Sequence, residues 1–269
     1  MRVVARRRTE RLALGLTLGG RMPTQLGTPD GYGPLALVGG DEFHPGNEPQ
    51  DRLLVEAARV LGGDRPALVI ATAAARHQPE RAVDTARGWF AELGLPVEEL
   101  PVRRRGQASD PGVVELARLG RFFYLVGGDP GIVPTTLHAT PAWAAVLDAW
   151  RAGAPLAGSS AGAMALGEWT LIRARVPGDS RRQARDGLAV VPGIAVLPHY
   201  ETFGHRWVPS AAEAVPGGAT LLGVDERSAA VWTGGKWRAM GAGGVTVIHG
   251  TPGPRFEAES EIDGLPQPA

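Results

Sequence analysis

The sequence has no cysteine among its 269 residues. This absence excludes disulfides, thiolate metal sites and cysteine nucleophiles, and it fits a reducing compartment, so we expect a cytoplasmic protein. The chain also lacks an excess of either charge, because 28 basic residues balance 28 acidic ones. Binding to nucleic acid or to an anionic membrane draws its affinity from surplus Lys and Arg, so we expect neither partner. No residue pattern indicates a cofactor or a metal site.

Long apolar runs are missing too, and none approaches the roughly 20 residues of a membrane-spanning helix. The first 32 residues carry six arginines against two acidic residues. The apolar stretch at 12–18 resembles a signal peptide, but it is short and no A-x-A cleavage site follows, so a leader or an over-long start is favoured. We expect residues 1–32 to be disordered or loosely attached, 33–263 to form a single domain and 264–269 to fray.

Apolar segments alternate with helical patterns in the first half of the chain. Alternation of this kind predicts an α/β fold with a mostly parallel central sheet and helices on both faces. After Met164 strands follow one another with little helix between them, which predicts antiparallel additions to the same sheet. The expected strands are 35–38, 67–70, 97–102, 122–126, 171–176, 188–197, 220–224, 229–232 and 245–248, and the expected helices 50–61, 79–93 and 113–119.

Glycine, in contrast, is abundant, with 38 residues, and it frames one serine. Ser160 stands at the centre of a G-x-S-x-G sequence, between Gly158 and Gly162, after a short apolar segment. Such a frame turns a strand sharply into a helix and exposes the serine hydroxyl, because larger flanking side chains would collide with neighbouring backbone. The sequence therefore predicts a nucleophile at Ser160. The N–H of Ala161 is the natural first donor to an oxyanion, and Gly128, at the end of another strand, is the best second donor.

A serine nucleophile needs a base and an acid that orients it. His199 follows a predicted strand downstream of Ser160 and is the favoured base, with His205 as the alternative. Position alone barely separates the acids, although Glu226 follows an apolar strand end and has a small advantage. The candidate acids are Glu168, Asp179, Asp186, Glu201, Asp225 and Glu226.

Four segments in this order resemble peptidase family S51, the serine peptidases that include aspartyl dipeptidases and cyanophycinases. They are residues 123–129 (FYLVGGD), 157–163 (AGSSAGA), 198–200 (PHY) and 223–229 (GVDERSA). The likeness covers about residues 33–248. It implies a fold like that of the class I glutamine amidotransferases, with Ser160 as nucleophile, His199 as base, Glu226 as acid, and Gly128 and Ala161 as the oxyanion hole.

Departures from the family pattern and a group of arginines bear on the substrate. Asp129 stands where the family commonly has Asn or Gln, and Leu197-Pro198 precedes the histidine where cyanophycinases have Asp-Gln, which disfavours cyanophycin cleavage. The Pro-His-Tyr form favours a dipeptidase. Arginines between Ser160 and His199, or soon after, are suited to a carboxylate: Arg173, Arg175, Arg181, Arg182 and Arg206.

We therefore expect a serine peptidase that hydrolyses small, acidic peptides, with a homodimer as the expected assembly. A cyanophycinase-like exopeptidase and a non-catalytic amidotransferase-like domain that binds a small ligand or partner are the alternatives.

Overall fold

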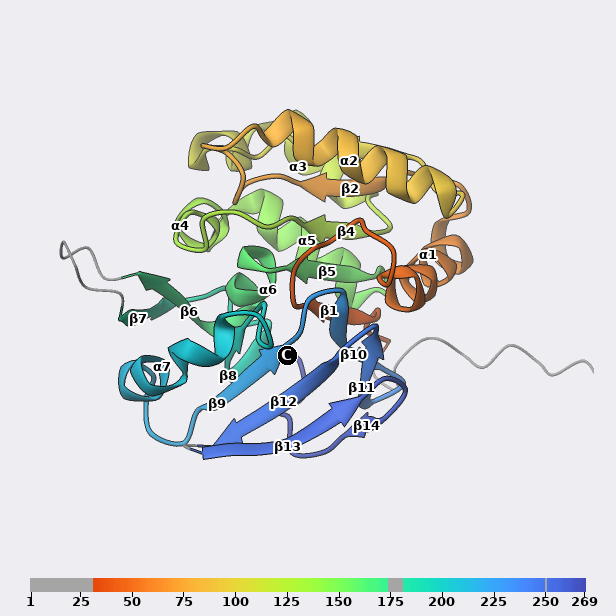
Figure 1. Cartoon of the computed structure of the whole chain (residues 1–269). Coiled ribbons are helices and arrows are strands. Elements are labelled where there is room, and N and C mark those ends of the chain that lie inside the picture. Colours follow the sequence, from red (N-terminus) through yellow and green to blue (C-terminus); the bar gives the residue numbers. More distant parts are fainter. Residues whose placement is uncertain (1–30, 174–180, 250) are drawn as a thin grey trace, which may run out of the picture.

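The computed structural model describes residues 31–173, 181–249 and 251–269, and two β-sheets form its framework (Figure 1). The larger sheet has the strand order β14-β11-β10-β1-β5-β4-β2-β3, and its five strands from β1 to β3 are parallel. The antiparallel strands β10, β11 and β14 extend one edge. The strands are β1 (Leu35–Val38), β2 (Ala67–Ile70), β3 (Val97–Glu99), β4 (Phe123–Leu125), β5 (Leu156–Ser159), β10 (Ser228–Thr233), β11 (Lys236–Gly241) and β14 (Glu261–Ile262).

Helices cover both faces of the parallel strands, as predicted. Alternate residues of β1 point to opposite faces: Ala36 and Val38 pack in one core cluster with α1 (Glu48–Gly62) and α2 (Pro79–Glu92). Leu35 and Leu37 belong to the other cluster, with α3 (Pro111–Leu119), α4 (Ile132–Leu137) and α5 (Pro141–Arg151). The apolar strands of the sequence are therefore buried on both sides, which is why they carry no alternating polar residues.

The expected antiparallel additions to that sheet are present as β10, β11 and β14, but the other strands of the second half do not join it, which corrects the expectation for them. They form a separate six-stranded sheet of order β13-β12-β9-β8-β6-β7, in which β8 is parallel to both β6 and β9. Its members are β6 (Gly167–Arg173), β7 (Arg182–Asp186), β8 (Val191–Leu197), β9 (Thr220–Val224), β12 (Gly244–His249) and β13 (Thr251–Glu257), with α7 (Val208–Ala214) between β8 and β9.

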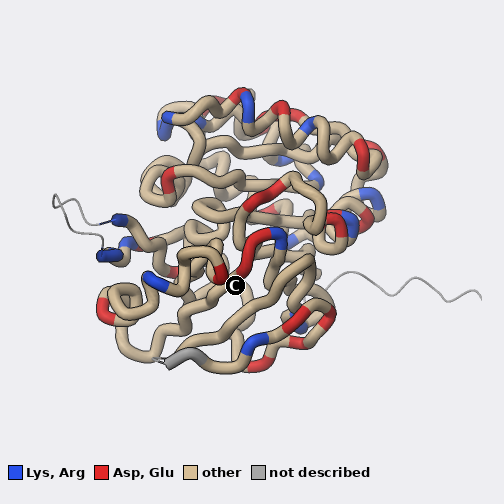
Figure 2. The backbone as a smooth tube through the Cα atoms, viewed as in Figure 1, with Lys and Arg blue, Asp and Glu red and all other residues tan. Residues whose placement is uncertain are grey.

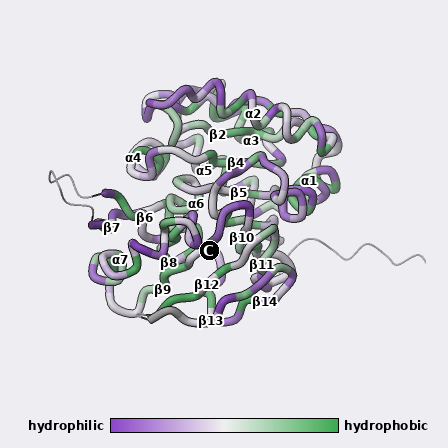
Figure 3. Tube along the Cα trace, viewed as in Figure 1, coloured by the Kyte–Doolittle hydropathy of each residue, from purple (hydrophilic) through white to green (hydrophobic). Residues whose placement is uncertain are grey.

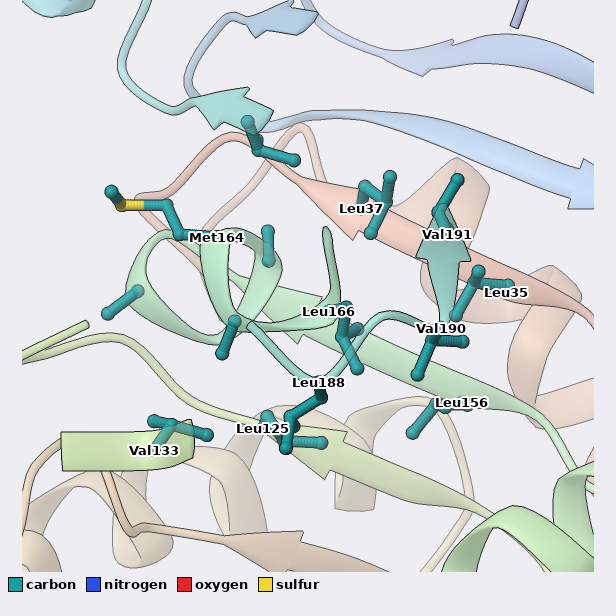
Figure 4. Packing of buried hydrophobic residues seen from close by; sticks show 14 of the residues in the cluster. Leu35, Leu37, Leu125, Val133, Leu156, Met164, Leu166, Leu188, Val190 and Val191 are labelled. Carbon is teal, nitrogen blue, oxygen red and sulfur yellow. The ribbon is translucent and has the colours of Figure 1, made fainter. Parts of the chain in front are cut away.

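The two sheets share one core cluster. Figure 4 shows Leu35 and Leu37 of β1 facing Val190 and Val191, with Leu166 nearby. Apolar strands fit either position, so the sequence pattern indicated strands without indicating which sheet they would join. The hydropathy map follows the same arrangement, with hydrophobic strands inside and hydrophilic residues along the outer helices (Figure 3).

The C-terminal tail, which we expected to fray, makes two hydrogen bonds to other parts of the chain. Pro266 accepts a hydrogen bond from the Trp237 indole at 2.9 Å, and Ala269 donates to the carbonyl of Val190 at 3.0 Å. Trp237 of β11 and Val190, the residue before β8, thus contact a tail that has no sequence pattern of its own. The predicted leader lies almost wholly outside the described residues. No helix within the described ranges is long and apolar enough to cross a membrane.

Candidate active site

Ser160 occupies the corner between β5 and α6 (Ala161–Leu166), at φ 48° and ψ −111°. The flanking glycines are required by close approach. A Cβ on Gly158 would lie 2.6 Å from the backbone of Gly162, and one on Gly162 would lie 2.3 Å from the carbonyl oxygen of Leu125. The predicted strand-to-helix elbow is therefore present, and its hydroxyl is partly exposed.

The imidazole of His199 lies between Ser160 and Glu226. Its Nε2 is 3.0 Å from the Ser160 hydroxyl, and its Nδ1 is 2.7 Å from Oε1 of Glu226. The ring is also stacked on Phe203, with centroids 4.8 Å apart. The three residues follow the ends of β5, β8 and β9, and hydrogen bonds join them in one series. In such a series the carboxylate fixes the imidazole tautomer, and Nε2 is free to accept a proton from the hydroxyl.

The end of β1 holds all three segments in place through consecutive carbonyls. The N–H of Ser160 donates to Val38 at 3.0 Å, that of His199 to Gly39 at 2.7 Å, and that of Arg227 to Gly40 at 2.9 Å. These glycines allow close packing: a Cβ on Gly39 would lie 2.0 Å from the Asp225 carbonyl oxygen, and one on Gly40 would lie 2.2 Å from Cε1 of His199. The relative positions of the three side chains therefore depend on main-chain bonds to one strand end.

Backbone strain is concentrated at this site. Nine non-glycine residues within the described ranges have positive φ, and five of them are Ser160 itself and four residues on the segments that follow β1, β8 and β9. Left-handed backbone costs a non-glycine residue energy and persists where the surroundings enforce it, which is common at functional sites. The five residues are Asp41, Phe43, Ser160, His199 and Arg227.

The proposed oxyanion donors stand at adjacent strand ends. Gly128 follows β4 at φ 143°, and a Cβ there would lie 2.3 Å from the Ala73 carbonyl oxygen, so only glycine fits. Its neighbours are engaged, because Gly127 donates to Glu42 and Asp129 donates to Ala73. Within the described chain the Gly128 N–H has no acceptor. An unpaired N–H on a fixed backbone is what binding of an oxyanion requires.

Three of the other candidate acids and bases, Glu201, Asp225 and His205, have partners elsewhere. Glu201 accepts the Glu226 N–H at 3.1 Å on each carboxylate oxygen, so it supports the segment that carries Glu226. Burial, with Asp225 adding to it, raises the pKa of Glu201. Asp225 is buried and pairs with Arg255 at 2.5 Å. His205 contacts the Tyr200 carbonyl at 2.8 Å, and Asp179 lies outside the described residues. The described residues contain no group of His, Asp and Glu that could hold a metal.

A hollow of about 700 Å³ begins just beyond Gly128. Asp129 lines it, and its carboxylate accepts the Gly131 N–H at 2.9 Å and lies 3.8 Å from Arg76, so the charge of Asp129 is already partnered. The basic residues that line it are Arg76, Arg173, Arg182 and Arg185. Arg76 was not predicted, because it lies in an early loop far from the serine in sequence.

A second hollow of about 430 Å³ shares two of these arginines. Arg173, Arg181, Arg182 and Arg206 line it together with Trp207. Arg175 lies outside the described residues. Figure 2 shows the basic segments at the outer end of the β6–β7 pair. Four of the five arginines that the sequence analysis grouped therefore line one hollow, and their role in substrate binding stays a prediction.

Arg182 is the most confined of these arginines. Its guanidinium lies 3.5 Å above the Trp207 ring, and its buried Nε has no hydrogen-bond partner among the described residues. Burial, followed by the charge of Arg173, lowers its pKa. Trp207 in turn contacts Phe203, at 5.3 Å between centroids, and Phe203 stacks on His199. A row of planar groups thus joins this hollow to the imidazole, a connection that sequence spacing did not indicate.

The comparisons with known proteins agree with this geometry. The model of peptidase family S51 matches residues 35–240. A crystal structure of a peptidase from an acI-B1 Actinobacterium is 32% identical, with a TM-score of 0.75, over 86% of this chain and 96% of that one. A candidate peptidase E from Listeria monocytogenes EGD-e is 19% identical, with a TM-score of 0.54 over 78% and 99%, and supports the fold alone. None of the curated proteins searched matches the chain.

The family match covers most of the chain, and the actinobacterial structure is similar over nearly its whole length. The four motifs that suggested the resemblance all fall within the matched residues, and three of them meet at the Ser160 corner. The chain belongs to peptidase family S51 and is a peptidase.

Proposed function

We propose that the protein is a serine peptidase that hydrolyses small peptides through an acyl-enzyme on Ser160. The hydrogen-bonded series from Ser160 through His199 to Glu226, with separations of 3.0 and 2.7 Å, carries this proposal. His199 Nε2 takes the hydroxyl proton as Ser160 Oγ attacks the scissile carbonyl. Glu226 holds the Nδ1 proton and stabilises the imidazolium that forms.

The tetrahedral intermediate places its negative oxygen between the N–H groups of Gly128 and Ala161. His199 then gives its proton to the leaving amine, the C–N bond breaks, and the acyl group remains on Ser160. Water, deprotonated by the same imidazole, releases the acid and restores the hydroxyl. The unpaired N–H of Gly128 supports its role, since a preorganised donor needs no rearrangement during the reaction.

We further propose that the preferred peptides carry a carboxylate. Six arginines line the two hollows, and the described lining of the smaller hollow includes no acidic residue. The unpartnered Nε of Arg182 and the nearby charge of Arg173 both favour an anion there. A planar guanidinium binds both oxygens of a carboxylate at once, which makes Arg suitable for this purpose.

Covalent labelling tests the nucleophile. A fluorophosphonate should add one equivalent to the wild type, measured by intact mass, and peptide mapping should place it on Ser160. The Ser160→Ala variant should take no label, and His199→Ala should react at least about 100-fold more slowly because the base is missing. An unlabelled wild type would favour a domain that binds a ligand without catalysis.

A library of dipeptides and tripeptides, read by mass spectrometry, tests the specificity. Acidic peptides should be cleaved at least about 10-fold faster than neutral peptides of equal length, the effect expected for one additional charged hydrogen bond. Pairs with free and amidated C-termini show whether the carboxylate is a side chain or the chain end. Equal cleavage across all pairs would remove the argument from the arginines.

A further inference from the structure

One carboxylate outside the series of Ser160, His199 and Glu226 joins the two strand ends that carry the proposed oxyanion donors. Oε1 of Glu42 accepts the Gly127 N–H at 2.8 Å, and Oε2 accepts the Ser159 hydroxyl at 2.8 Å. Gly127 immediately precedes Gly128, and Ser159 immediately precedes Ser160. Glu42 thus bridges the end of β4 and the end of β5, next to the reacting groups.

The position of Glu42 is fixed from both sides. Its neighbours Asp41 and Phe43 have φ of 52° and 63°, so the backbone is strained on either side of it. Phe43 is buried against Tyr124, with ring centroids 5.0 Å apart. The amide of the fully buried Asn47 donates to the Asp41 carbonyl at 2.9 Å. In Figure 1 this segment between β1 and α1 curves across the ends of the neighbouring strands.

The partners of Glu42 differ from those of an ordinary surface carboxylate. Asp41, the preceding residue, pairs with Arg227 at 2.5 Å. Glu42 makes no ion pair with any described residue, and its two hydrogen-bond partners are neutral donors at the ends of different strands. Hydrogen bonds to an ionised acceptor are stronger than bonds between neutral groups. Because an ionised carboxylate only accepts, the Ser159 hydroxyl is the donor in its bond with Glu42.

We infer that Glu42 is a positioning residue that sets the separation between the N–H groups of Gly128 and Ala161. This inference rests on the proposed function, in which both N–H groups bind the same oxygen. Oxyanion stabilisation depends on donors that are already in place when charge develops. Gly127 is one residue before the first donor and Ser159 is two residues before the second, so a bridge between them would limit the relative movement of the donors. Glu42 does not itself contact the reacting atoms in this role.

The alternative is direct contact between Glu42 and substrate. Glu42 lines a hollow of about 420 Å³ together with Gly127 and Gly128. In this alternative, the free amino terminus of a peptide substrate enters the hollow and binds Glu42. The two roles make different kinetic predictions. A positioning residue affects kcat for every substrate, whereas an amine-binding residue affects KM, and only for peptides with a free amino terminus.

The test compares Glu42→Gln with Ser159→Ala and their combination, on one peptide with a free and with an acetylated amino terminus. Glu42→Gln places an amide NH₂ against one of the two donors. We expect kcat to fall about 10- to 100-fold for both peptides, with KM within about threefold, below the loss of a whole oxyanion donor. Ser159→Ala should lower kcat less, and the combination should lower it by less than the product of the two effects, because both changes break one bridge.

Glu48→Gln is the matched control. Glu48 also accepts one backbone N–H, from Gly46 at 2.6 Å, but it has no bond to either strand end. It should keep wild-type kcat, and circular dichroism should show that all variants fold. If Glu42→Gln fails to fold, the Ser159→Ala result decides.

Two outcomes overturn the inference: wild-type kcat in Glu42→Gln and Ser159→Ala, or a rise of KM confined to the free-amine peptide. A wild type without Ser160-dependent turnover would instead contradict the proposed function, so the two failures are distinguishable.

Discussion

The Ser160 corner and the arginine-lined hollows lie next to each other but are built by different means. At the corner, main-chain bonds to Val38, Gly39 and Gly40 fix the three proposed reacting residues, and glycines permit the close approach. In the hollows, long side chains from β6, β7 and the segment before α7 provide the charge. Backbone geometry thus determines the proposed reaction, whereas replaceable side chains determine the proposed selectivity. Changes at the corner should alter rate for all peptides, and changes in the hollows should alter which peptides are used.

The largest effect is expected at the corner itself. Ser160→Ala removes the attacking oxygen, so turnover should fall by at least about 10³-fold for acidic and neutral peptides alike. Thermal unfolding should change by only a few degrees, because Ser160 is partly exposed. Steady-state hydrolysis and a melting curve check both points. Retention of wild-type turnover would show that another group is the nucleophile.

Gly40→Ala should produce the next largest effect without removing any functional atom. The new Cβ would lie 2.2 Å from Cε1 of His199, at a φ of 117° that alanine resists. Displacing the imidazole by about 1 Å costs on the order of 100-fold in kcat. Gly106→Ala is the control, since its Cβ would meet no atom within 4 Å. Equal kcat in the two variants would mean that the end of β1 does not position His199.

A smaller and selective effect is expected in the hollows. Arg182→Gln removes the confined guanidinium above Trp207. KM for acidic peptides should rise about 10-fold, near 1.4 kcal/mol, while neutral peptides change less than about twofold. Arg238→Gln is the control, because Arg238 is exposed on β11, and it should leave KM unchanged for both acidic and neutral peptides. If Arg182→Gln lowers kcat equally for acidic and neutral peptides, the hollows affect rate rather than selectivity, and the proposed difference between the Ser160 corner and the hollows is wrong.

The smallest effect concerns stability. Burial raises the pKa of Asp51 on α1 from 3.8 to about 7, although the Trp89 indole donates to it at 2.8 Å. Between about pH 4 and 7 the folded chain keeps a proton that the unfolded chain releases, so stability falls as pH rises through this range.

Asp51→Asn should therefore stabilise the protein by about 1–3 kcal/mol at pH 8 and by much less at pH 4.5. Urea unfolding at both pH values measures this, with the exposed Asp64→Asn as control. A gain that is equal at both pH values would contradict the assigned cause, because an effect of packing alone does not depend on protonation. Activity at the corner should be unchanged.

The sequence predicted the parallel strands well because each is a short apolar run between helices, and the Ser160 elbow because glycine is required there. It did not predict the second sheet, since Val191–Leu197 is equally apolar in either sheet. The sequence analysis did not identify Glu42 as a functional residue, for a different reason. A single carboxylate after a strand resembles a solvated loop residue, and only the fold brings Gly127 and Ser159 to it. The choice between Glu201 and Glu226 likewise depends on where β9 ends.

The bonds at the end of β1 also bear on the order of synthesis and assembly. Val38, Gly39 and Gly40 are made early, but their partners Ser160, His199 and Arg227 lie far along the chain, and Arg227 and Asp41 are 186 positions apart. Contacts of such sequence separation close late in folding, after shorter loops have formed. A growing or partly unfolded chain therefore holds its serine away from its histidine. Peptide hydrolysis should therefore appear only once the fold is complete, and a partly folded chain should be inactive.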